Sequence, residues 1–338
     1  MIGGGERYPM WLADEMAHQV PTTLVTFGSK RRSFQRGSLQ VEVYPVRRFA
    51  SGAKWDPVSI RFVGVLRHYD VVHVHQFRTF VSNLSVTSAA FLNKRVFLTD
   101  HGGSALHLPD TSLLGKLVDG VLPVSQFSQL ELHLDRPTRV IGGGVPDEML
   151  APLEHRERLG VLFVGRLLPH KGVEYLIKAV EPDVPLVVIG RAYDDVYFER
   201  LQQLAAGKSV RFITDAGDDT LADCYRQAVV TVLPSVYTDE DGRTAAAPEL
   251  LGLALLESMA CGTPVICTDV GGMPEFVDDG ITGYIVPPND IEALRERIHR
   301  LIADASLARQ MGLRARDFVQ QNSTWAHVVD RCLDAYEA

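Results

Sequence analysis

The chain has 338 residues, of which 46% are hydrophobic and 22% charged, with a formal net charge of −8 at neutral pH. These values are typical of a globular protein long enough for two cores, and they argue against a disordered or fibrous chain. The sequence contains no apolar run long enough for a transmembrane helix, and residues 1–8 lack the basic and apolar regions of a signal peptide. We therefore expect a cytoplasmic protein.

Short apolar segments alternate along the chain with segments of helical periodicity. Such an alternation predicts parallel sheets covered on both faces and, because two series occur, two Rossmann-like α/β domains. We expect domains at 1–148 and 149–322, with a final helix in 323–338 packing back on the first domain. The expected strands are 22–28, 41–46, 70–75, 95–99, 120–125, 138–141, 161–165, 186–190, 210–214, 230–234, 264–268 and 283–286, and the expected helices include 6–17, 173–180, 197–206, 221–228, 291–302 and 325–336.

Two carboxylates, Glu249 and Glu257, bracket a run of Leu, Ala and Gly that predicts a buried helix. We place Glu249 at or just before the helix N-terminus and Glu257 two turns into the helix. Buried carboxylates need partners, and sugar hydroxyls at either end of an elongated ligand would supply them, with an anion at the helix N-terminus. The alternative is that both glutamates simply pair with basic neighbours.

Arg166 and Lys171 follow the strand expected at 161–165, with Gly172 opening the next helix. Ligands of open parallel sheets bind at the carboxyl ends of strands, so two cations beside a glycine suit a diphosphate. They are otherwise solvated loop cations. Gly271 and Gly272 follow another strand and could offer backbone N–H groups to an anion or hydroxyl.

In the first half, Gly3, Gly4 and Gly5 precede a helix and form a possible phosphate cradle, although no strand leads into them. His101 follows the strand at 95–99 and should stand at its carboxyl end, where an imidazole could contact a sugar hydroxyl or a reacting centre. We prefer His101 to its neighbour Asp100. His73 and His75 lie within an expected strand, which favours supporting positions in the core.

Three further features of the sequence are weaker evidence about function. The sparse cysteines Cys224, Cys261, Cys267 and Cys332 form no CxxC pair and predict neither disulfides nor a zinc site. The pair Asp239 and Asp241 matches an Asp-x-Asp metal motif superficially, but no strand leads directly into it, so we expect no metal. A basic loop could touch an anionic membrane, and without interleaved aromatics it does not favour nucleic acid; its residues are Lys30, Arg31, Arg32 and Arg36.

In their order along the chain, these motifs resemble the retaining glycosyltransferases of family 4, which have the GT-B architecture. The resemblance covers nearly the whole chain and is strongest over 160–290. Its carriers are Gly165-Arg166 with Lys171-Gly172, Leu233-Pro-Ser235, Glu249 and Glu257 with the Ser-Met-Ala-Cys-Gly-Thr-Pro264 that follows, Gly271-Gly-Met-Pro-Glu275 and Gly283-Tyr-Ile-Val-Pro-Pro288; residues 70–75 and 322–325 are also similar.

The resemblance implies a nucleotide-diphosphate sugar in a cleft between two domains and transfer of a hexose-like sugar with retained configuration, without cofactor or metal. It implies that Arg166 and Lys171 bind the diphosphate, Glu257 the ribose, and Glu249 the donor sugar. Backbone groups at Gly252, Leu253 and Ala254 would assist, and Gly3, Gly4, Gly5 and His101 would close over the donor. The implied catalytic residues are His101, Arg166, Lys171 and Glu249.

The chain also departs from the family pattern. It starts at the glycine loop, so the first strand of the pattern is apparently missing, and Leu251 stands where an aromatic residue is common. The missing strand makes an inactive nucleotide-sugar-binding protein of the same fold one alternative. A sugar-nucleotide epimerase or phosphorylase of this fold is another, against which the spacing of Glu249 and Glu257 argues. A dinucleotide oxidoreductase is disfavoured because no Gly-x-Gly-x-x-Gly follows a strand. The acceptor stays open between polysaccharide, lipid and small molecule, and peripheral attachment to the inner face of the membrane is one option.

Overall fold

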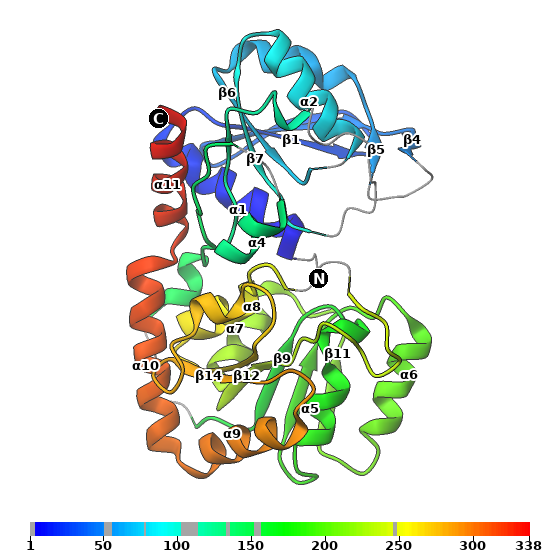
Figure 1. Ribbon diagram of the computed structural model, residues 1–338, viewed down its shortest axis with the longest axis vertical. Helices are drawn as coiled ribbons and strands as arrows, with labels where there is room; N and C mark the ends of the chain where they lie inside the picture. Colours follow the sequence, from blue (N-terminus) through cyan, green and yellow to red (C-terminus); the bar gives the residue numbers. More distant parts are fainter. Residues whose placement is uncertain are drawn as a thin grey trace. The chain divides into compact units, whose positions relative to one another are not determined.

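The computed structural model describes residues 4–50, 56–77, 79–102, 114–132, 136–151, 157–245 and 249–338 (Figure 1). The chain divides into two compact units. The N-terminal unit comprises Gly5–Gly142 together with Trp325–Ala338, and the C-terminal unit contains Gly143–Thr324. Each unit has its own parallel strands, which confirms the expected α/β class with two Rossmann-like parts.

The C-terminal unit is built on a six-stranded parallel sheet. The strand order is β11-β10-β9-β12-β13-β14, and the strands are rich in Val, Ile and Leu, as expected for a sheet buried on both faces. The strands are β9 (Val161–Val164), β10 (Leu186–Ile189), β11 (Val210–Ile213), β12 (Val230–Leu233), β13 (Val265–Thr268) and β14 (Gly283–Val286).

Helices cover both faces of this sheet (Figure 1). Alternation along β9 divides the core: Val161 and Phe163 pack in one cluster, and Leu162 and Val164 in the other. The helices are α5 (Val173–Ala179), α6 (Asp195–Leu204), α7 (Asp218–Gln227), α8 (Leu253–Ala260), α9 (Ile291–Ala303) and α10 (Ala305–Asn322), with the short 3-10 turns η3 (Asp147–Leu150), η4 (Pro169–Lys171) and η5 (Met273–Phe276).

The described part of the N-terminal unit contains two three-stranded sheets that share one hydrophobic cluster, and a two-stranded sheet of β4 (Arg48–Phe49) and β5 (Pro57–Val58). In the first, β1 (Thr23–Gly28) runs parallel to β3 (Leu39–Pro45), and β2 (Arg32–Arg36) is antiparallel to β3. In the second, β6 (Val71–His75), β7 (Arg95–Thr99) and β8 (Gly120–Val121) are parallel. The remaining elements are η2 (Arg61–His68), α1 (Gly4–Gln19), α2 (Phe80–Phe91), α4 (Gln126–Leu132) and α11 (Trp325–Glu337).

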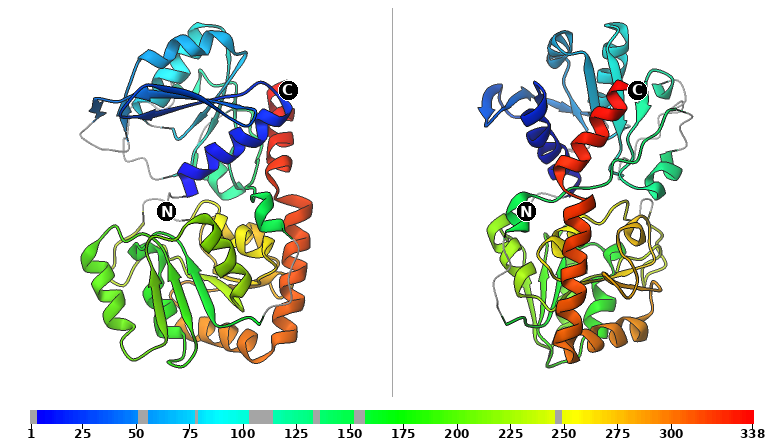
Figure 2. Two further views of the ribbon diagram at one scale, coloured as in Figure 1. Left: turned by 180° about the vertical axis from the view of Figure 1, so that it is seen from behind. Right: turned by 90° about the vertical axis from the view of Figure 1, so that its left-hand side faces the viewer.

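The last helix, α11, packs on the N-terminal unit, where it lies beside α1 (Figure 2). The Trp325 ring meets the Tyr8 ring edge-on at 4.9 Å between centroids. Arg139 donates to Asp334 at 2.7 Å, and the Tyr336 hydroxyl lies 2.7 Å from Nδ1 of His73. The chain therefore returns to its first unit after completing the second.

Three expectations for the N-terminal unit were wrong. Residues 138–141 form no strand, because Thr138 makes only an isolated bridge to Val121. Of the expected strand 120–125, only Gly120–Val121 forms a regular strand, although Leu122 N–H still donates to the Leu98 carbonyl at 2.7 Å. The basic segment includes a strand, β2, which pairs antiparallel to β3 because a two-residue turn suffices for that geometry.

Two of the four arginine and lysine side chains expected to touch a membrane are already paired within the unit. Arg31 forms an ion pair with Glu42 and stacks over the Tyr44 ring at 4.2 Å, and Arg36 lies 3.6 Å from Asp14. This pairing reduces the charge that the segment presents to an anionic surface. Within the described residues, no helix is both long and apolar enough to cross a bilayer.

Candidate active site

The strand order of the C-terminal sheet places a topological switch point between β9 and β12. From β9 the chain proceeds to β10 and β11 on one side, and from β12 to β13 and β14 on the other. Ligands of open α/β sheets bind outside the carboxyl ends of the two strands at such a point. The segments that follow β9 and β12 are therefore the first place to look for a site.

Lys171 and Glu249 form an ion pair beyond the carboxyl end of β9. Both side chains are largely buried, with 12% of Lys171 and 19% of Glu249 exposed. Burial by itself raises the pKa of Glu249, but the charge and hydrogen bond of Lys171, with His170 and Arg166 adding to them, lower it below its ordinary value. The carboxylate is therefore ionised at neutral pH, and the pair has no net charge.

The glycine after Lys171 brings its loop against the next strand. Gly172 has a φ of +66°, and a Cβ there would stand 2.0 Å from the carbonyl oxygen of Pro234, at the end of β12. Only glycine allows both this backbone conformation and this approach. The segments following β9 and β12 consequently meet at the switch point.

Two more basic side chains flank the ion pair. Arg166 is exposed, immediately after β9. Burial, and then the charges of Lys171 and Arg166, lower the pKa of His170 to about 4, so its imidazole is neutral at physiological pH. Because Glu249 neutralises one cation, an incoming dianion would meet Arg166 and a Lys171 that it must share with the carboxylate.

Glu249 precedes the helix, as expected, but Glu257 lies less far into the helix than the two turns expected. Helix α8 begins at Leu253, so Glu249 lies in the preceding loop and Glu257 about one turn into the helix. The loop is held by the Gly271–Gly272 pair: Gly272 N–H donates to the Glu249 carbonyl at 2.9 Å, and a Cβ at Gly271 would overlap that same carbonyl.

The backbone donors of that glycine pair are therefore in use, contrary to the expectation that they stand ready for a ligand. Gly271 N–H donates to the Tyr237 hydroxyl at 2.9 Å, and Gly272 N–H to Glu249. The glycines act by positioning the glutamate. The sequence showed the motif, but a hydrogen bond to a residue 34 positions away could not be read from it.

Glu257 is 4% exposed and has a partner that sequence reasoning missed. The hydroxyl of Tyr225, a fully buried residue of α7, donates to Glu257 Oε2 at 2.8 Å. The sequence gives no local sign of this bond, because Tyr225 occupies a helical position that an ordinary core aromatic residue would also occupy. The bond fixes the direction of one carboxylate oxygen.

The N-terminus of α8 lies between the two glutamates in sequence. Its N-cap, Gly252, has a φ of +83°, and the first residues of the helix are Leu253 and Ala254. First-turn N–H groups have no partner within a helix, and together with the helix dipole they favour an anion. The expected backbone donors thus stand at a helix start.

The acidic loop that superficially matched a metal motif is explained by local structure. Asp239 Oδ1 accepts from the N–H groups of Asp241 and Arg243 at 3.0 and 2.8 Å, and Asp241 pairs with Arg200. Among the residues that the structure describes, no group of three or more His, Cys, Asp or Glu is arranged to hold a metal ion.

In the N-terminal unit, His101 stands after β7, as expected. Its Nε2 lies 3.1 Å from Nδ1 of His75, which ends β6. The rival Asp100 accepts from Phe77 N–H and Gly102 N–H, both at 3.0 Å, and so fastens two loops together. Of the two neighbours, His101 is the one whose ring is not committed to the backbone by these bonds.

The predicted glycine loop is only partly within the described residues. Gly3 lies outside them, α1 begins at Gly4, and Gly5 is in the first turn. A Cβ on Gly5 would stand 3.5 Å from Cβ of His101. Gly5, in the first turn of α1, and His101 are thus neighbours within the N-terminal unit. Lys171 and Glu249 belong to the C-terminal unit.

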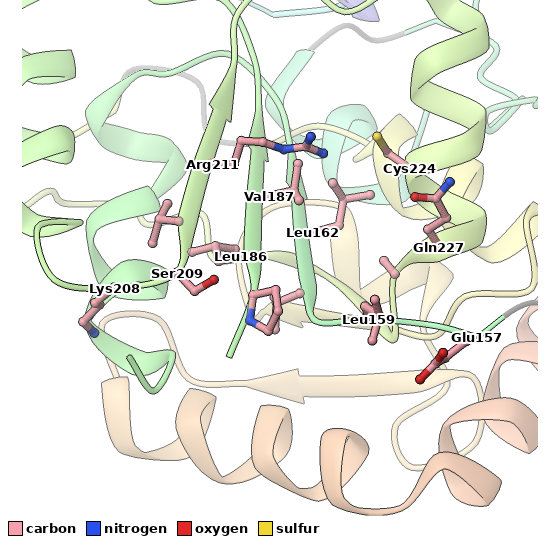
Figure 3. A pocket seen from close by; sticks show the side chains of 14 residues that line it. Glu157, Leu159, Leu162, Leu186, Val187, Lys208, Ser209, Arg211, Cys224 and Gln227 are labelled. Carbon is pink, nitrogen blue, oxygen red and sulfur yellow. The ribbon is translucent and has the colours of Figure 1, made fainter. Parts of the chain in front are cut away.

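A cavity of about 500 Å³ opens at the amino ends of strands of the C-terminal sheet, opposite the carboxyl ends where the candidate site lies (Figure 3). Its walls come from the first residues of β9, β10 and β11 and from the end of α7. Arg211 extends over the sheet face toward Cys224. None of the predicted donor-binding residues lines it, so the cavity is separate from the candidate site.

Comparison with known proteins gives the family. Residues 148–318 match the model described as glycosyl transferases group 1, and residues 2–148 match that of glycosyltransferase family 4. The α-maltose-1-phosphate synthase of Mycolicibacterium smegmatis is 36% identical over 52% of this chain and 47% of its own length. An uncharacterized glycosyltransferase of Methanocaldococcus jannaschii is 31% identical over 71% of this chain and 67% of its own.

The first of these relatives is matched over about half of its own length. Solved structures share the fold over nearly the whole chain. The Anabaena protein HepE, crystallised with UDP and glucose, has a TM-score of 0.78 at 18% identity, covering 99% of this chain and 96% of that one. Sucrose-phosphate synthase from Thermosynechococcus elongatus has a TM-score of 0.75 at 22% identity, with coverages of 99% and 93%. The chain therefore belongs to family 4 of the glycosyltransferases, with the GT-B fold.

Proposed function

We propose that this glycosyltransferase moves a hexose-like sugar from a nucleotide-diphosphate donor to an acceptor hydroxyl, with retention of configuration and without a metal ion. The observation that carries the proposal is the Lys171–Glu249 ion pair at the switch point, beside Arg166 and before the start of α8. This arrangement offers a cation, a carboxylate and a helix N-terminus to one elongated ligand.

Each group has a role that its chemistry suits. Arg166 and Lys171 bind the diphosphate and stabilise the negative charge that grows on it as the glycosidic bond breaks. Glu249 accepts hydrogen bonds from hydroxyls of the donor sugar, and Glu257 accepts them from the ribose. The first turn of α8 directs its N–H groups at the same anion.

Metal independence follows from the same charges in this proposal. A departing diphosphate needs positive charge, which two cations and a helix dipole supply in place of a divalent ion. When the donor is absent, Glu249 holds Lys171 in position. When a dianion arrives, Lys171 exchanges part of its interaction with the carboxylate for the phosphate, and Glu249 turns to the sugar hydroxyls.

The donor class is the part of the proposal best supported by the neighbours. The HepE crystals contain UDP and glucose, so a uridine diphosphate hexose is the first probe to use. The acceptor is a hydroxyl on a polysaccharide, lipid or small molecule; one relative is named for a sugar phosphate product and another for an inositol phosphate acceptor.

The test is a donor panel. The protein is incubated with UDP-, GDP-, ADP- and dTDP-sugars, with and without EDTA, and nucleotide release and thermal shift are followed. We expect one nucleotide to raise the melting temperature selectively and its sugar form to be slowly hydrolysed, equally in EDTA. Stabilisation with no turnover for any donor, with or without candidate acceptors, would favour an inactive binding protein and overturn the transferase proposal.

Stereochemistry is tested on the product. Once an acceptor is found, the anomeric proton coupling of the new glycoside distinguishes retention from inversion. An inverted product would refute the retaining assignment while leaving the transfer itself intact. EDTA-sensitive turnover restored by Mg²⁺ would refute metal independence alone.

A further inference from the structure

The N-terminal unit contains a chain of hydrogen bonds that fixes the protonation of one histidine. Tyr336 O–H lies 2.7 Å from Nδ1 of His73, and Nε2 of His73 lies 2.8 Å from the Thr99 hydroxyl. The Thr99 hydroxyl donates its single proton to the Leu122 carbonyl at 2.7 Å. His73 must therefore donate from Nε2 to Thr99 and accept at Nδ1 from Tyr336, so both of its nitrogens are satisfied.

Two further histidines, His75 and His101, form a pair beside this series of hydrogen bonds. His75 Nδ1 and His101 Nε2 are 3.1 Å apart, and the two rings are within 8° of parallel. Burial lowers the pKa of His101 to about 4, and burial together with the charges of His73 and His101 keeps the pKa of His75 well below its usual value. Both rings are neutral at physiological pH, so one must donate and the other accept.

That requirement couples the two tautomers. If His75 donates from Nδ1, His101 carries its proton on Nδ1; if His101 donates from Nε2, its Nδ1 is bare. In either case Nε2 of His101 is committed to His75, and a ligand that meets this imidazole does so through Nδ1. The state of that nitrogen is set by a residue that need not touch the ligand.

The backbone holds the pair in register. Gln76, which follows His75, has a φ of +69°, a conformation that is uncommon for a residue with a side chain and that often marks functional sites. Its N–H donates to the Thr99 carbonyl and its side-chain amide to the Gly102 carbonyl, both at 2.8 Å. The ends of β6 and β7 are therefore fastened on either side of His101.

The ring of His101 is also packed from the helix side. The Tyr8 ring lies 4.8 Å from it between centroids, and Tyr8 itself is anchored through its hydroxyl to the Gly142 carbonyl at 2.7 Å. A ring confined by an aromatic ring tilted against it at 52° and by a hydrogen-bonded neighbour has few rotamers left. The site is built to present one orientation of one imidazole.

We propose that His75 is a positioning residue for His101: it selects the tautomer and the ring orientation with which His101 meets its substrate through Nδ1. The inference rests on the proposed function and adds to it the role that the family resemblance implied for His101, which is to act on the sugar or the acceptor during transfer. It adds a residue that the family resemblance did not assign and that the sequence placed only in the strand interior.

The experiment compares His75→Leu, His75→Asn, His101→Ala and the double variant His75→Leu/His101→Ala. Asparagine can place an amide group near the position of Nδ1, and leucine cannot. We expect His75→Leu to lower kcat about 10- to 100-fold, the scale of a misplaced catalytic group, and His75→Asn to recover most of the loss. Nucleoside diphosphate affinity should stay within about twofold, because a positioning defect removes no nucleotide contact.

The double variant tests the coupling. If His75 acts through His101, its loss costs nothing further once His101 is absent, so the double variant should be no slower than His101→Ala. A matched control is Tyr336→Phe, which removes the hydroxyl that bonds His73 and Cys332 and leaves His75 and His101 in place. We expect it to lower the melting temperature without changing kcat, which separates loosening of the fold from loss of positioning.

A second readout needs no turnover. In 15N-edited spectra of the imidazole nitrogens, His101 should show one fixed tautomer in the parent protein and a mixture in His75→Leu. An unchanged His101 tautomer overturns the inference, as does full activity of His75→Leu when His101→Ala is inactive. Full activity of His101→Ala instead refutes the role of His101 in the proposed function, so the two failures are distinguishable.

Discussion

Replacing Lys171 by methionine should reverse the way in which stability depends on pH. In the parent protein the pKa of Glu249 is lowered by Lys171, so the pair stabilises the fold above the ordinary carboxyl pKa and its contribution is lost as pH falls through the lowered value. In Lys171→Met the burial remains while the cation is gone, so the pKa of Glu249 should rise. Stability should then decline as pH rises through that raised value.

The magnitude follows from burial. Removing one partner of a fully buried pair costs about 3–5 kcal/mol. Since 12% of Lys171 and 19% of Glu249 remain exposed, we expect solvent to reduce the cost to about 2–3 kcal/mol at pH 7. For a unit of this size that corresponds to a melting temperature lower by about 5–10 °C. Because the proposed function assigns the same cation to the diphosphate, kcat should fall about 10²- to 10³-fold.

The assay is thermal denaturation from pH 4 to 8 together with steady-state turnover. Lys171→Met/Glu249→Gln is the informative control, because it removes both charges and should regain most of the stability while remaining inactive. If Lys171→Met melts at the parent temperature throughout this range, the ion pair is not what holds the site. If the double variant regains turnover, Lys171 has no role at the diphosphate.

Three further predictions concern other parts of the chain. Glu257→Ala should weaken nucleoside diphosphate binding, as measured by calorimetry, and should also lower the melting temperature because the buried Tyr225 hydroxyl loses this acceptor; unchanged affinity would remove Glu257 from the ribose site. Gly172→Ala should lower the melting temperature far more than Gly207→Ala, because both have positive φ but only the former would overlap a carbonyl oxygen, 2.0 Å away. The pKa values of His73 and His101 are lowered by burial to about 3 and about 4, so the unfolded chain binds protons that the folded chain does not, and stability should fall as pH drops below about 6.5. Denaturant titrations that give equal stability at pH 7 and pH 5 would contradict this.

The C-terminal sheet could be predicted almost entirely from the sequence. Its strands are continuous runs of Val, Ile and Leu, and such runs are favoured when both faces of a sheet are covered, so the local pattern and the tertiary environment agree. The expected strand at 186–190, for example, differs from the observed β10 by one residue.

The N-terminal unit could be predicted less well for the opposite reason. All five residues of β2, Arg32–Arg36, are exposed, so no hydrophobic pattern marks the strand. Its position depends on pairing with β3, whose apolar residues do face a core. The segment at 138–141 has the converse problem: it is apolar and buried in part, but makes only one bridge.

The residues of the candidate site also differ in how well they could be predicted from the sequence. Lys171 and Glu249 could each be named in advance because both stand in recognisable motifs, but their pairing with each other was not predicted from the sequence. Tyr225 and His75 could not, because each acts through a hydrogen bond to a residue 26 or more positions away, and periodicity describes only which face a residue occupies. The error about the depth of Glu257 in the helix had a related cause: a positive φ at Gly252 starts the helix later than the apolar run suggests.

Because α11 packs on the first unit, the two units differ in how well each should fold as a separate fragment. A fragment ending at Gly142 would lack the tryptophan that meets Tyr8 and the hydroxyl that meets His73, so it should express poorly or aggregate. A fragment spanning residues 143–324 is uninterrupted in sequence and is the better choice for isolated work. On the ribosome, the first unit must wait for α11 to emerge before its aromatic contacts with that helix can form.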